Sequence, residues 1–318
     1  MKRRGAQAGS VLVVALGSLA MLAVMATGIR TALFTETRLI RYRRAQMHAM
    51  SWARAGVYLA LQRLAEDANQ PEREDWLGDD WAVIEARDAA ARAAWEVVMP
   101  VIHEDPTALD GVIRIEVIDE DRKLDLNTAG AHELERLLGD AELARIILAH
   151  RTPRPIHALE ELWDLPEMSR QDEARRVMLE HGTVWTRGMV NLNTVQREVL
   201  AALVPDPALV DRLVESRPGP DGAWGTADDC KATAVSTAPT ELASCAVIDA
   251  QALVSVLTHP GWRVSSSVFR IRAEGHVTRP AVRYRIDAVV RRGGSADPAA
   301  SMIRMAAQSF QIVEWREG

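Results

Sequence analysis

The stretch SVLVVALGSLAMLAVMATGI, from Ser10 to Ile29, contains no charged side chain. At ~1.5 Å of rise per residue, a helix of this length just spans a hydrocarbon core of ~30 Å. The basic residues Lys2, Arg3 and Arg4 precede it. A secretory signal peptide has a shorter apolar core, usually ~7–15 residues, followed by a small-residue cleavage site. The sequence therefore predicts a membrane-spanning helix over residues 10–29.

The helical pattern continues beyond the apolar stretch. No proline lies between Met1 and Pro71, and apolar residues from Leu33 to Leu64 recur at three-, four- and seven-residue spacings. Because this spacing is that of one helical face, residues 30–68 are predicted to extend the membrane helix into a single spine of ~85 Å. Arginines follow the apolar stretch at positions 30, 38, 41, 43 and 44. They outnumber the preceding basic residues, but long domains can be translocated against such a charge bias, so the orientation stays open.

The composition is that of a folded protein with an acidic balance. Of 318 residues, 48% are hydrophobic and 26% are charged, which predicts packed globular structure rather than disorder. The net charge of −6 argues against nucleic acid as the main partner, because phosphate binding needs a basic surface. Two cysteines are too few for a disulfide scaffold or a cysteine-only zinc site. No phosphate loop, nucleophile elbow or HExxH helix occurs, and the eight histidines are scattered, so no enzymatic activity is predicted.

The residues before the apolar stretch bear on processing. Basic side chains are followed by Gly9, by the small residue Ser10 and then by the unbroken apolar run. This order resembles the type IV prepilin pattern, in which a membrane peptidase cuts on the cytoplasmic side of the apolar segment and leaves that segment in the mature protein. The resemblance implies a leader over residues 1–9 and a mature N-terminus at Ser10. Gly5 is a competing site, although residues 6–8 would then precede the apolar run.

The residue at the fifth position of the predicted mature chain indicates which family of pilin-like proteins the sequence resembles. Most pilin-like proteins carry a glutamate there, whereas this sequence has Val14. A carboxylate in the apolar filament core needs a neighbour's N-terminal amine, so a subunit without it suits the filament tip, where no neighbour lies above. Within the pilin-like proteins this absence is typical of the minor pseudopilin K family of type II secretion systems. Residues 111–129, GVIRIEVIDEDRKLDLNTA, also resemble that family's strand, acidic turn and Asn-Thr helix start.

Period-two patterning near the C-terminus predicts a sheet. Apolar and polar side chains alternate there, so that Phe269 and Ile271 face one way while Arg270 and Arg272 face the other. We therefore predict an α+β, pilin-like fold, in which the long N-terminal helix packs on a small antiparallel sheet. The predicted strands are residues 112–119, 268–277, 282–292 and 309–315. The predicted parts are the start of the α/β domain at 69–118, a large all-helical (helix-hairpin-helix or SAM-like) insertion at 119–262, and closing strands at 263–318.

Two segments of the insertion, residues 124–151 and 190–217, align at a constant offset of 66 residues. Both contain an Asn-Thr pair, Asn127-Thr128 and Asn193-Thr194, followed by apolar residues at helical spacing. Each segment is predicted to form a helical hairpin that begins with an Asn or Thr cap. The hairpins resemble helix-hairpin-helix DNA-binding units, but their turns, LLGDAE and LVPDPA, lack the Gly-x-Gly amides that grip phosphate. Nucleic acid is therefore not predicted as a partner.

The loop GPDGAWGTADDC, residues 219–230, gathers three carboxylates. Asp221, Asp228 and Asp229 lie among glycines that keep the loop pliable, and hard oxygen ligands on a flexible loop are what Ca²⁺ prefers. The spacing is similar to that of Asp-Gly…Asp-Asp loops in pseudopilins that bind calcium, so these aspartates are candidate Ca²⁺ ligands. An ordinary solvated Asx turn is the alternative.

Two further features of the insertion are its two cysteines and a second acidic turn. In an oxidising periplasm Cys230 and Cys245 are predicted to pair and close a loop worth ~3 kcal/mol, with two buried free thiols as the alternative. The acidic turn Asp119-Glu120-Asp121 is a weaker second calcium candidate, and we interpret it as a solvated turn before a helix.

The family resemblance implies a function for the whole chain. A minor pseudopilin of this kind would lie at the pseudopilus tip and initiate assembly of the filament that exports folded proteins across the outer membrane. It would be cut by prepilin peptidase, methylated, and held in the cell inner membrane by one span, with its C-terminal domain in the periplasm. The implied partners are I- and J-type minor pseudopilins through the spine helix, with secreted substrates or the outer-membrane secretin as further candidates. A minor pilin of a related type IV pilus system and a membrane-anchored helix-hairpin-helix DNA-uptake protein are the alternatives.

Overall fold

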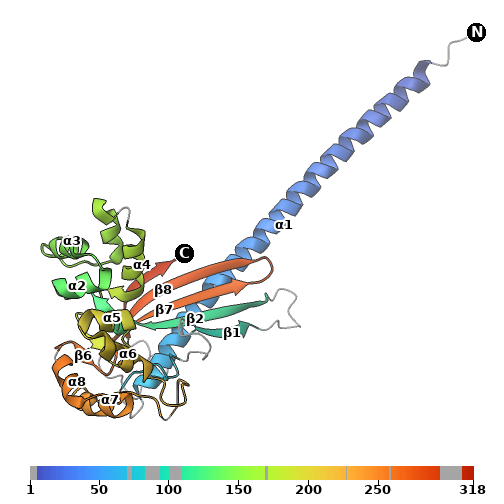
Figure 1. Ribbon diagram of the computed structural model, residues 1–318. Helices are drawn as coiled ribbons and strands as arrows, with labels where there is room; N and C mark the ends of the chain where they lie inside the picture. The colour runs from blue at the N-terminus through green and yellow to red at the C-terminus, as the bar shows by residue number, and fades with distance from the viewer. Residues whose placement is uncertain are drawn as a thin grey trace, which may run out of the picture.

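One helix dominates the molecule. The computed structural model describes residues 6–69, 74–82, 94–99, 109–168, 171–226, 228–257, 259–293 and 310–318. Helix α1 (Ala6–Ala68) is continuous over 63 residues, and its N-terminal half projects away from the rest of the protein (Figure 1). Every residue from Val11 to Arg43 is exposed, and the first buried side chain is Ala45. The spine predicted from the sequence is therefore present, but only its C-terminal third packs against the folded body.

The packed part of α1 uses small side chains at four-residue intervals. Ala45, Ala49 and Ala53 are completely buried and lie on one helical face, which contacts β7, β8 and β2. The helix approaches the sheet closely at Gly275 in β7, where a Cβ atom would lie 2.1 Å from the carbonyl oxygen of Ala49. Larger apolar residues, such as Leu64, continue the contact toward the end of the helix.

The sheet has five antiparallel strands in the order β1-β2-β7-β8-β9. The strands are β1 (Ala94–Met99), β2 (Gly111–Asp119), β7 (Val268–Val277), β8 (Val282–Arg292) and β9 (Phe310–Glu317). Strands β7 and β8 have the bounds that the alternation predicts, whereas β1 was not predicted. Ile115, Phe269 and Ile271 face α1 and are fully buried, so arginines and carboxylates occupy the opposite face.

Helices fill the chain between β2 and β7 and lie at the end of the molecule away from the free end of α1 (Figure 1). The elements of the first half are η1 (Glu120–Arg122), β3 (Leu124–Asp125), α2 (Ala131–Leu138), α3 (Ala141–Arg151), η2 (Leu159–Asp164), η3 (Pro166–Met168), α4 (Asp172–His181) and β4 (Gly182–Thr183). Those of the second half are β5 (Val190–Asn191), α5 (Arg197–Leu203), α6 (Pro207–Glu215), α7 (Ala238–Ala246), α8 (Ala250–Val256) and β6 (Trp262–Arg263). They share a hydrophobic core separate from the one between α1 and the sheet.

Equivalent contacts recur at the offset of 66 residues. The side chain of Asn127 donates to the Ile156 carbonyl (2.9 Å) and accepts from its amide (2.8 Å), and Asn193 pairs with Ala232 at 3.0 and 2.8 Å in the same way. Each asparagine thus anchors the chain that follows its hairpin, which lies 29 or 39 residues away. The prediction that an Asn or Thr caps the first helix is therefore wrong at these positions, because the amide group is used for a tertiary contact.

The second helix of each hairpin is capped by an aspartate. Asp140 accepts from the amides of Glu142 and Leu143 at the start of α3, and Asp206 accepts from those of Ala208 and Leu209 at the start of α6. The C-terminal arginine of each hairpin donates to two carbonyl groups of its Asn-Thr turn. These pairs are Arg151 with Leu126 and Ala129, and Arg217 with Leu192 and Val195.

Candidate functional site: an exposed helix and a buried polar junction

The free half of α1 is an apolar surface without a cover in the described structure. By length and composition this helix is long and apolar enough to cross a membrane, and none of its most apolar 18-residue segment is buried. Large side chains along it, such as Val14, Leu22 and Ile29, are 62–68% exposed. Since burying apolar surface is favourable at ~25 cal/mol per Å², such a rod needs lipid or other helices around it.

The predicted cleavage site lies at the start of this helix. Because α1 begins at Ala6, the Gly9–Ser10 bond falls within its first turns, and residues 1–5 lie outside the described residues. Val14 takes the fifth position after this bond, so no carboxylate occurs in the exposed apolar segment until Glu36.

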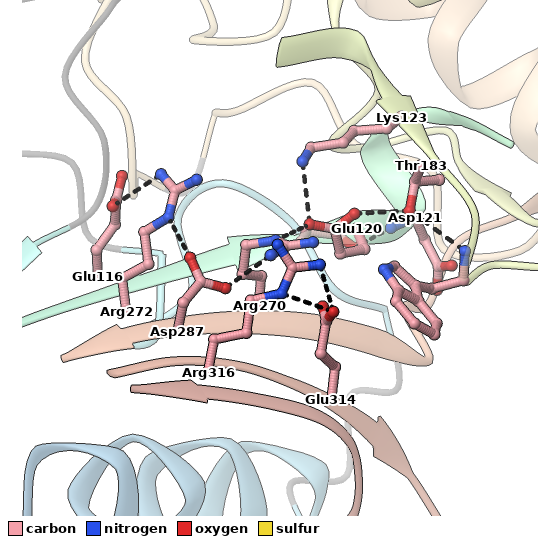
Figure 2. Close-up of polar contacts among 12 residues, drawn as sticks. Glu116, Glu120, Asp121, Lys123, Thr183, Arg270, Arg272, Asp287, Glu314 and Arg316 are labelled. Carbon is pink, nitrogen blue, oxygen red and sulfur yellow. Dashed lines mark hydrogen bonds and ion pairs between the residues drawn. The ribbon is translucent and has the colours of Figure 1, made fainter. Parts of the chain in front are cut away.

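A chain of alternating charges lies on the sheet face opposite α1, where the sheet meets the helical region (Figure 2). At its centre, the fully buried Glu120 accepts from Lys123 Nζ at 3.0 Å, Arg270 Nε at 2.7 Å and Thr183 Oγ1 at 2.7 Å. Burial alone would raise the pKa of Glu120, but Lys123 and Arg270 outweigh it and lower the pKa to about 2. Glu120 therefore stays ionised and joins strand β7 to the helical region.

The series of alternating charges continues across the strands of the sheet. Arg270 Nη1 lies 2.6 Å from Asp287 Oδ1, Arg272 Nε lies 3.0 Å from Asp287 Oδ2, and Arg272 Nη1 lies 3.3 Å from Glu116 Oε2 (Figure 2). We call the connected set of Glu116, Glu120, Lys123, Thr183, Arg270, Arg272 and Asp287 the polar junction. Beside it, Arg316 of β9 pairs with Glu314 and with Glu160 of η2, which makes a second link between sheet and helices.

The acidic turn Asp119-Glu120-Asp121 is buried, so the prediction of a solvated turn is wrong. Asp119 Oδ2 accepts from Ser266 Oγ at 2.6 Å and also from the Thr194 hydroxyl, while Asp121 Oδ2 accepts from Ser267 Oγ at 3.0 Å. Burial raises the pKa of Asp119, and burial with the charge of Asp119 raises that of Asp121. The hydroxyl donors come from segments 75–147 residues away, which explains why the local sequence looked like a surface turn.

Another acidic cluster forms where α1 ends. Carboxylate oxygens of Asp67, Asp75 and Asp79 lie within 4.8 Å of one another. Arg292 of β8 donates twice to Asp75, both at 3.0 Å, and once to Asp67 at 3.3 Å. Burial, together with the charges of Asp79 and Asp75, raises the pKa of Asp67, and burial is also the main cause that raises the pKa of Asp79 to about 6. The guanidinium bridges Asp67 and Asp75, and no sequence motif pointed to the cluster because Arg292 lies 225 and 217 residues from these two aspartates.

The three aspartates of the predicted calcium loop bind the loop's own donors. Asp221 Oδ1 accepts from the Ala223 amide at 2.7 Å, Asp228 Oδ1 from the Thr226 hydroxyl at 2.7 Å, and Asp229 Oδ2 from the amide of Gly225 at 2.7 Å. Gly219, Gly222 and Gly225 all have positive φ, which gives the loop its tight path. Asp221 and Asp228 are exposed, but among the described residues the three aspartates of this loop do not bring three ligand atoms within 4.8 Å of one another, as Asp67, Asp75 and Asp79 do.

The two cysteines meet directly after this loop. Cys230 and Cys245 form a disulfide with Cα atoms 5.8 Å apart, which ties the end of the aspartate loop to α7.

Two comparisons with known proteins bear on the family of this chain. The family model "Type II secretion system (T2SS), protein K" matches residues 190–246, from β5 to the end of α7. A chain in the solved GspK-GspI-GspJ complex of the type 2 secretion system of enterotoxigenic Escherichia coli is similar in fold. Its TM-score is 0.56 at 16% identity, over 89% of this chain and 99% of that chain. Family match and fold together support a minor pseudopilin of the K type.

The family resemblance seen in the sequence is thereby confirmed, and no curated protein sequence matches significantly. The matched residues contain the second helical hairpin, the aspartate loop and both cysteines. The apolar half of α1 is a candidate single membrane span and fits the inner-membrane anchor of a pseudopilin.

Proposed function

We propose that this chain is the tip subunit of a type II secretion pseudopilus and that it initiates assembly of the filament. The observation that carries the proposal is the polarity of the molecule. A bare apolar helix lies at one end and the bulk of seven helices, α2 to α8, lies at the other (Figure 1). Subunits of such a filament pack through their helices, and this bulk would obstruct a subunit stacked above it.

The absence of an acidic side chain near the predicted mature N-terminus supports the same position. A carboxylate at the place of Val14 would be buried among apolar helices and would need a partner amine from a neighbour. A tip subunit has no such neighbour above it, so valine avoids an unpaired buried charge.

The membrane arrangement follows from the helix. Residues 10–29 cross the inner membrane, prepilin peptidase cuts between Gly9 and Ser10, and the folded body lies in the periplasm. Mass spectrometry of the mature protein tests this directly. We expect an N-terminus at Ser10, carrying a methyl group, whereas an intact Met1 or a cut after Ile29 would contradict the proposed processing.

Helix α1 is the proposed contact with other minor pseudopilins, as the solved relative is described in complex with GspI and GspJ. Ile40 and Leu179 offer a matched test, because both are large exposed apolar residues, at 59% and 52% exposure, on α1 and α4. We expect Ile40→Asp to prevent co-purification of the full chain with I- and J-type subunits and Leu179→Asp to leave it intact. Equal effects of the two variants would contradict docking through α1. Secreted substrates and the secretin remain candidate contacts for the helical end.

Tip position needs a separate experiment. Gold labelling of an epitope on the exposed α7–α8 turn should mark one end of purified pseudopili. Labels spread along the shafts, or filaments that never carry the label, would contradict the proposal.

We also propose that Asp221, Asp228 and Asp229 hold Ca²⁺, which would add a structural cross-link to the loop before the disulfide. The thermal midpoint of the full chain should then fall in EDTA and recover with Ca²⁺ but not with Mg²⁺. The DNA-uptake alternative has less support, because Asp140 and Asp206 occupy the helix N-terminal amides that would otherwise bind phosphate. A gel-shift assay in which the full chain binds duplex DNA, with binding that weakens as salt is raised, would support the DNA-uptake alternative.

A further inference from the structure

Beyond the apolar stretch, arginines gather on one face of α1. At ~100° per residue, the side chains of four arginines lie within about 120° of one another around the helix axis. They are Arg30, Arg38, Arg41 and Arg44, and we call them the arginine face. Among the described residues none of the four forms an ion pair, and Arg38 lies over the ring of Phe34 at 5.4 Å. The arginine face extends over ~21 Å of helix.

The arginine face continues the side of α1 that the folded body covers. Arg41 and Arg38 lie about one and two turns before Ala45, the first buried residue of the helix, on the same face. The sheet reaches only to this level, because Ala45 packs with Val277 and Val282 at the two ends of the β7–β8 turn. Beyond this turn no described element lies against α1 (Figure 1).

The charged groups described nearby do not neutralise this face. Glu36 is the only acidic side chain in residues 1–65. It lies ~135° around the helix from the centre of the arginine face, on the same side as Arg43. At the end of the sheet, the exposed Asp110 and Arg279 contribute one charge of each sign. Among the described residues, no carboxylate therefore balances the arginine face.

A second face of the exposed helix is apolar. Leu33, Ile40 and Met47 recur every seven residues and are 59–65% exposed. Seven-residue spacing is the pattern by which helices pack side by side, so this stripe fits the proposed contact with another pseudopilin helix. The arginine face lies ~100° around the helix from the stripe. Charged side chains beside an apolar helix contact set which partner is accepted.

We propose that the arginine face binds an acidic surface of an I- or J-type minor pseudopilin and so selects these subunits over a second copy of this chain. This rests on the proposed function, in which α1 docks other minor pseudopilins. Two parallel copies of α1 that packed through this face would bring arginines against arginines, and the single Glu36 of each copy lies on another face. Like charges brought together in this way disfavour the contact. Exclusion of a second copy agrees with one such subunit at a filament tip.

Anionic lipid is the weaker candidate for the arginine face. On a straight helix, Arg41 and Arg44 lie ~18 and ~22 Å beyond residue 29, where the proposed span ends. The headgroup region adds only ~5–8 Å to each side of the hydrocarbon core. Most of the arginine face therefore lies above the headgroups, at the height where neighbouring subunits meet.

The test compares two charge reversals that lie two residues apart on α1. Arg41→Glu changes the arginine face, whereas Arg43→Glu makes the same change of charge on the opposite side of the helix. The full chain in detergent micelles is titrated with purified I- and J-type subunits of the same secretion system at low and at high salt. At low salt we expect Arg41→Glu to weaken binding about tenfold and Arg43→Glu by less than about twofold. Arg41→Lys, which keeps the charge, should bind like the wild type.

The affinity of the wild type should fall as salt is raised, and Arg41→Glu should lose most of this dependence, because salt screens exposed ion pairs. Equal effects of Arg41→Glu and Arg43→Glu, or a wild-type affinity that does not depend on salt, would overturn the proposal.

Ile40→Asp on the apolar stripe separates this proposal from the proposed function. If Ile40→Asp prevents binding while Arg41→Glu does not weaken it, the helix contact stands and the arginine face has no part in it. A wild-type chain that binds no I- or J-type subunit at either salt concentration would refute the proposed function itself. Self-association of the full chain at low salt that Arg41→Glu abolishes would assign the face to a second copy and overturn the choice of partner.

Discussion

The polar junction makes a quantitative prediction about stability. Glu120→Gln keeps the shape of the side chain but removes its charge, which leaves Lys123 and Arg270 facing an amide. Their side chains are only 6% and 13% exposed, and Arg270 retains Asp287 as its other partner. Breaking a buried ion pair from one side costs ~3–5 kcal/mol, because the remaining charge stays desolvated. We expect the lower end of this range for Glu120→Gln, since Asp287 still compensates Arg270.

A second substitution separates charge from packing. In Glu120→Gln/Lys123→Met the stranded ammonium is removed, so at least half of the lost stability should return. The control is Glu142→Gln on α3, whose pair with Arg145 is exposed on both sides and should be worth less than ~1 kcal/mol. Urea unfolding of the detergent-solubilised full chain, followed by tryptophan fluorescence, measures all of these variants. Equal losses for Glu120→Gln and Glu142→Gln would refute the assignment of a buried, stabilising junction.

Three further predictions concern other parts of the fold. Because burial raises the pKa of Asp79 to about 6 from 3.8, the folded state holds its proton more tightly, so the stability from this group is present below pH 4 and lost as the pH rises through 6. Asp79→Asn should flatten that part of a melting-temperature profile measured between pH 4 and 8. Removing the disulfide with Cys230→Ser/Cys245→Ser should cost ~3 kcal/mol by urea unfolding, and an unchanged midpoint would contradict its contribution. Gly275→Ala would place a Cβ against the backbone of α1 and should cost ~1–3 kcal/mol, whereas Gly28→Ala, with open space around it, should be neutral or stabilising in the same assay.

Local periodicity explains which elements the sequence could predict. The apolar stretch and the following helical spacing extend over nearly sixty residues without a proline, so a single helix was predicted and α1 is one helix. In β7 and β8 the alternation of apolar and charged residues predicted both the bounds and the two faces. Strand β1 was missed, because its pairing with β2 is a tertiary contact between segments that the sequence does not mark.

The buried acidic residues, in contrast, could not be predicted from local sequence. Asp119, Glu120 and Asp121 lie in a short polar segment that resembles a surface turn, yet all three are at most 2% exposed. Their partners, among them Thr194, Ser266 and Arg270, come from β7, from the loop before it and from the turn before α5. Similarly, Asp67 and Asp75 share the guanidinium of Arg292, which comes from β8 more than two hundred residues later. No pattern within one segment carries this information.

The sequence by itself determined the long helix α1, its apolar half, the arginines that follow the apolar stretch and the alternating strands β7 and β8. Periodicity and the grouping of charges are properties of neighbouring residues, so they can be seen without the fold. Tertiary structure alone decided which carboxylates are buried and which are free. The cost of burying the Glu120 carboxylate depends on donors that the fold brings from 63 and 150 residues away, Thr183 and Arg270, and that cost separates the polar junction from an ordinary acidic turn.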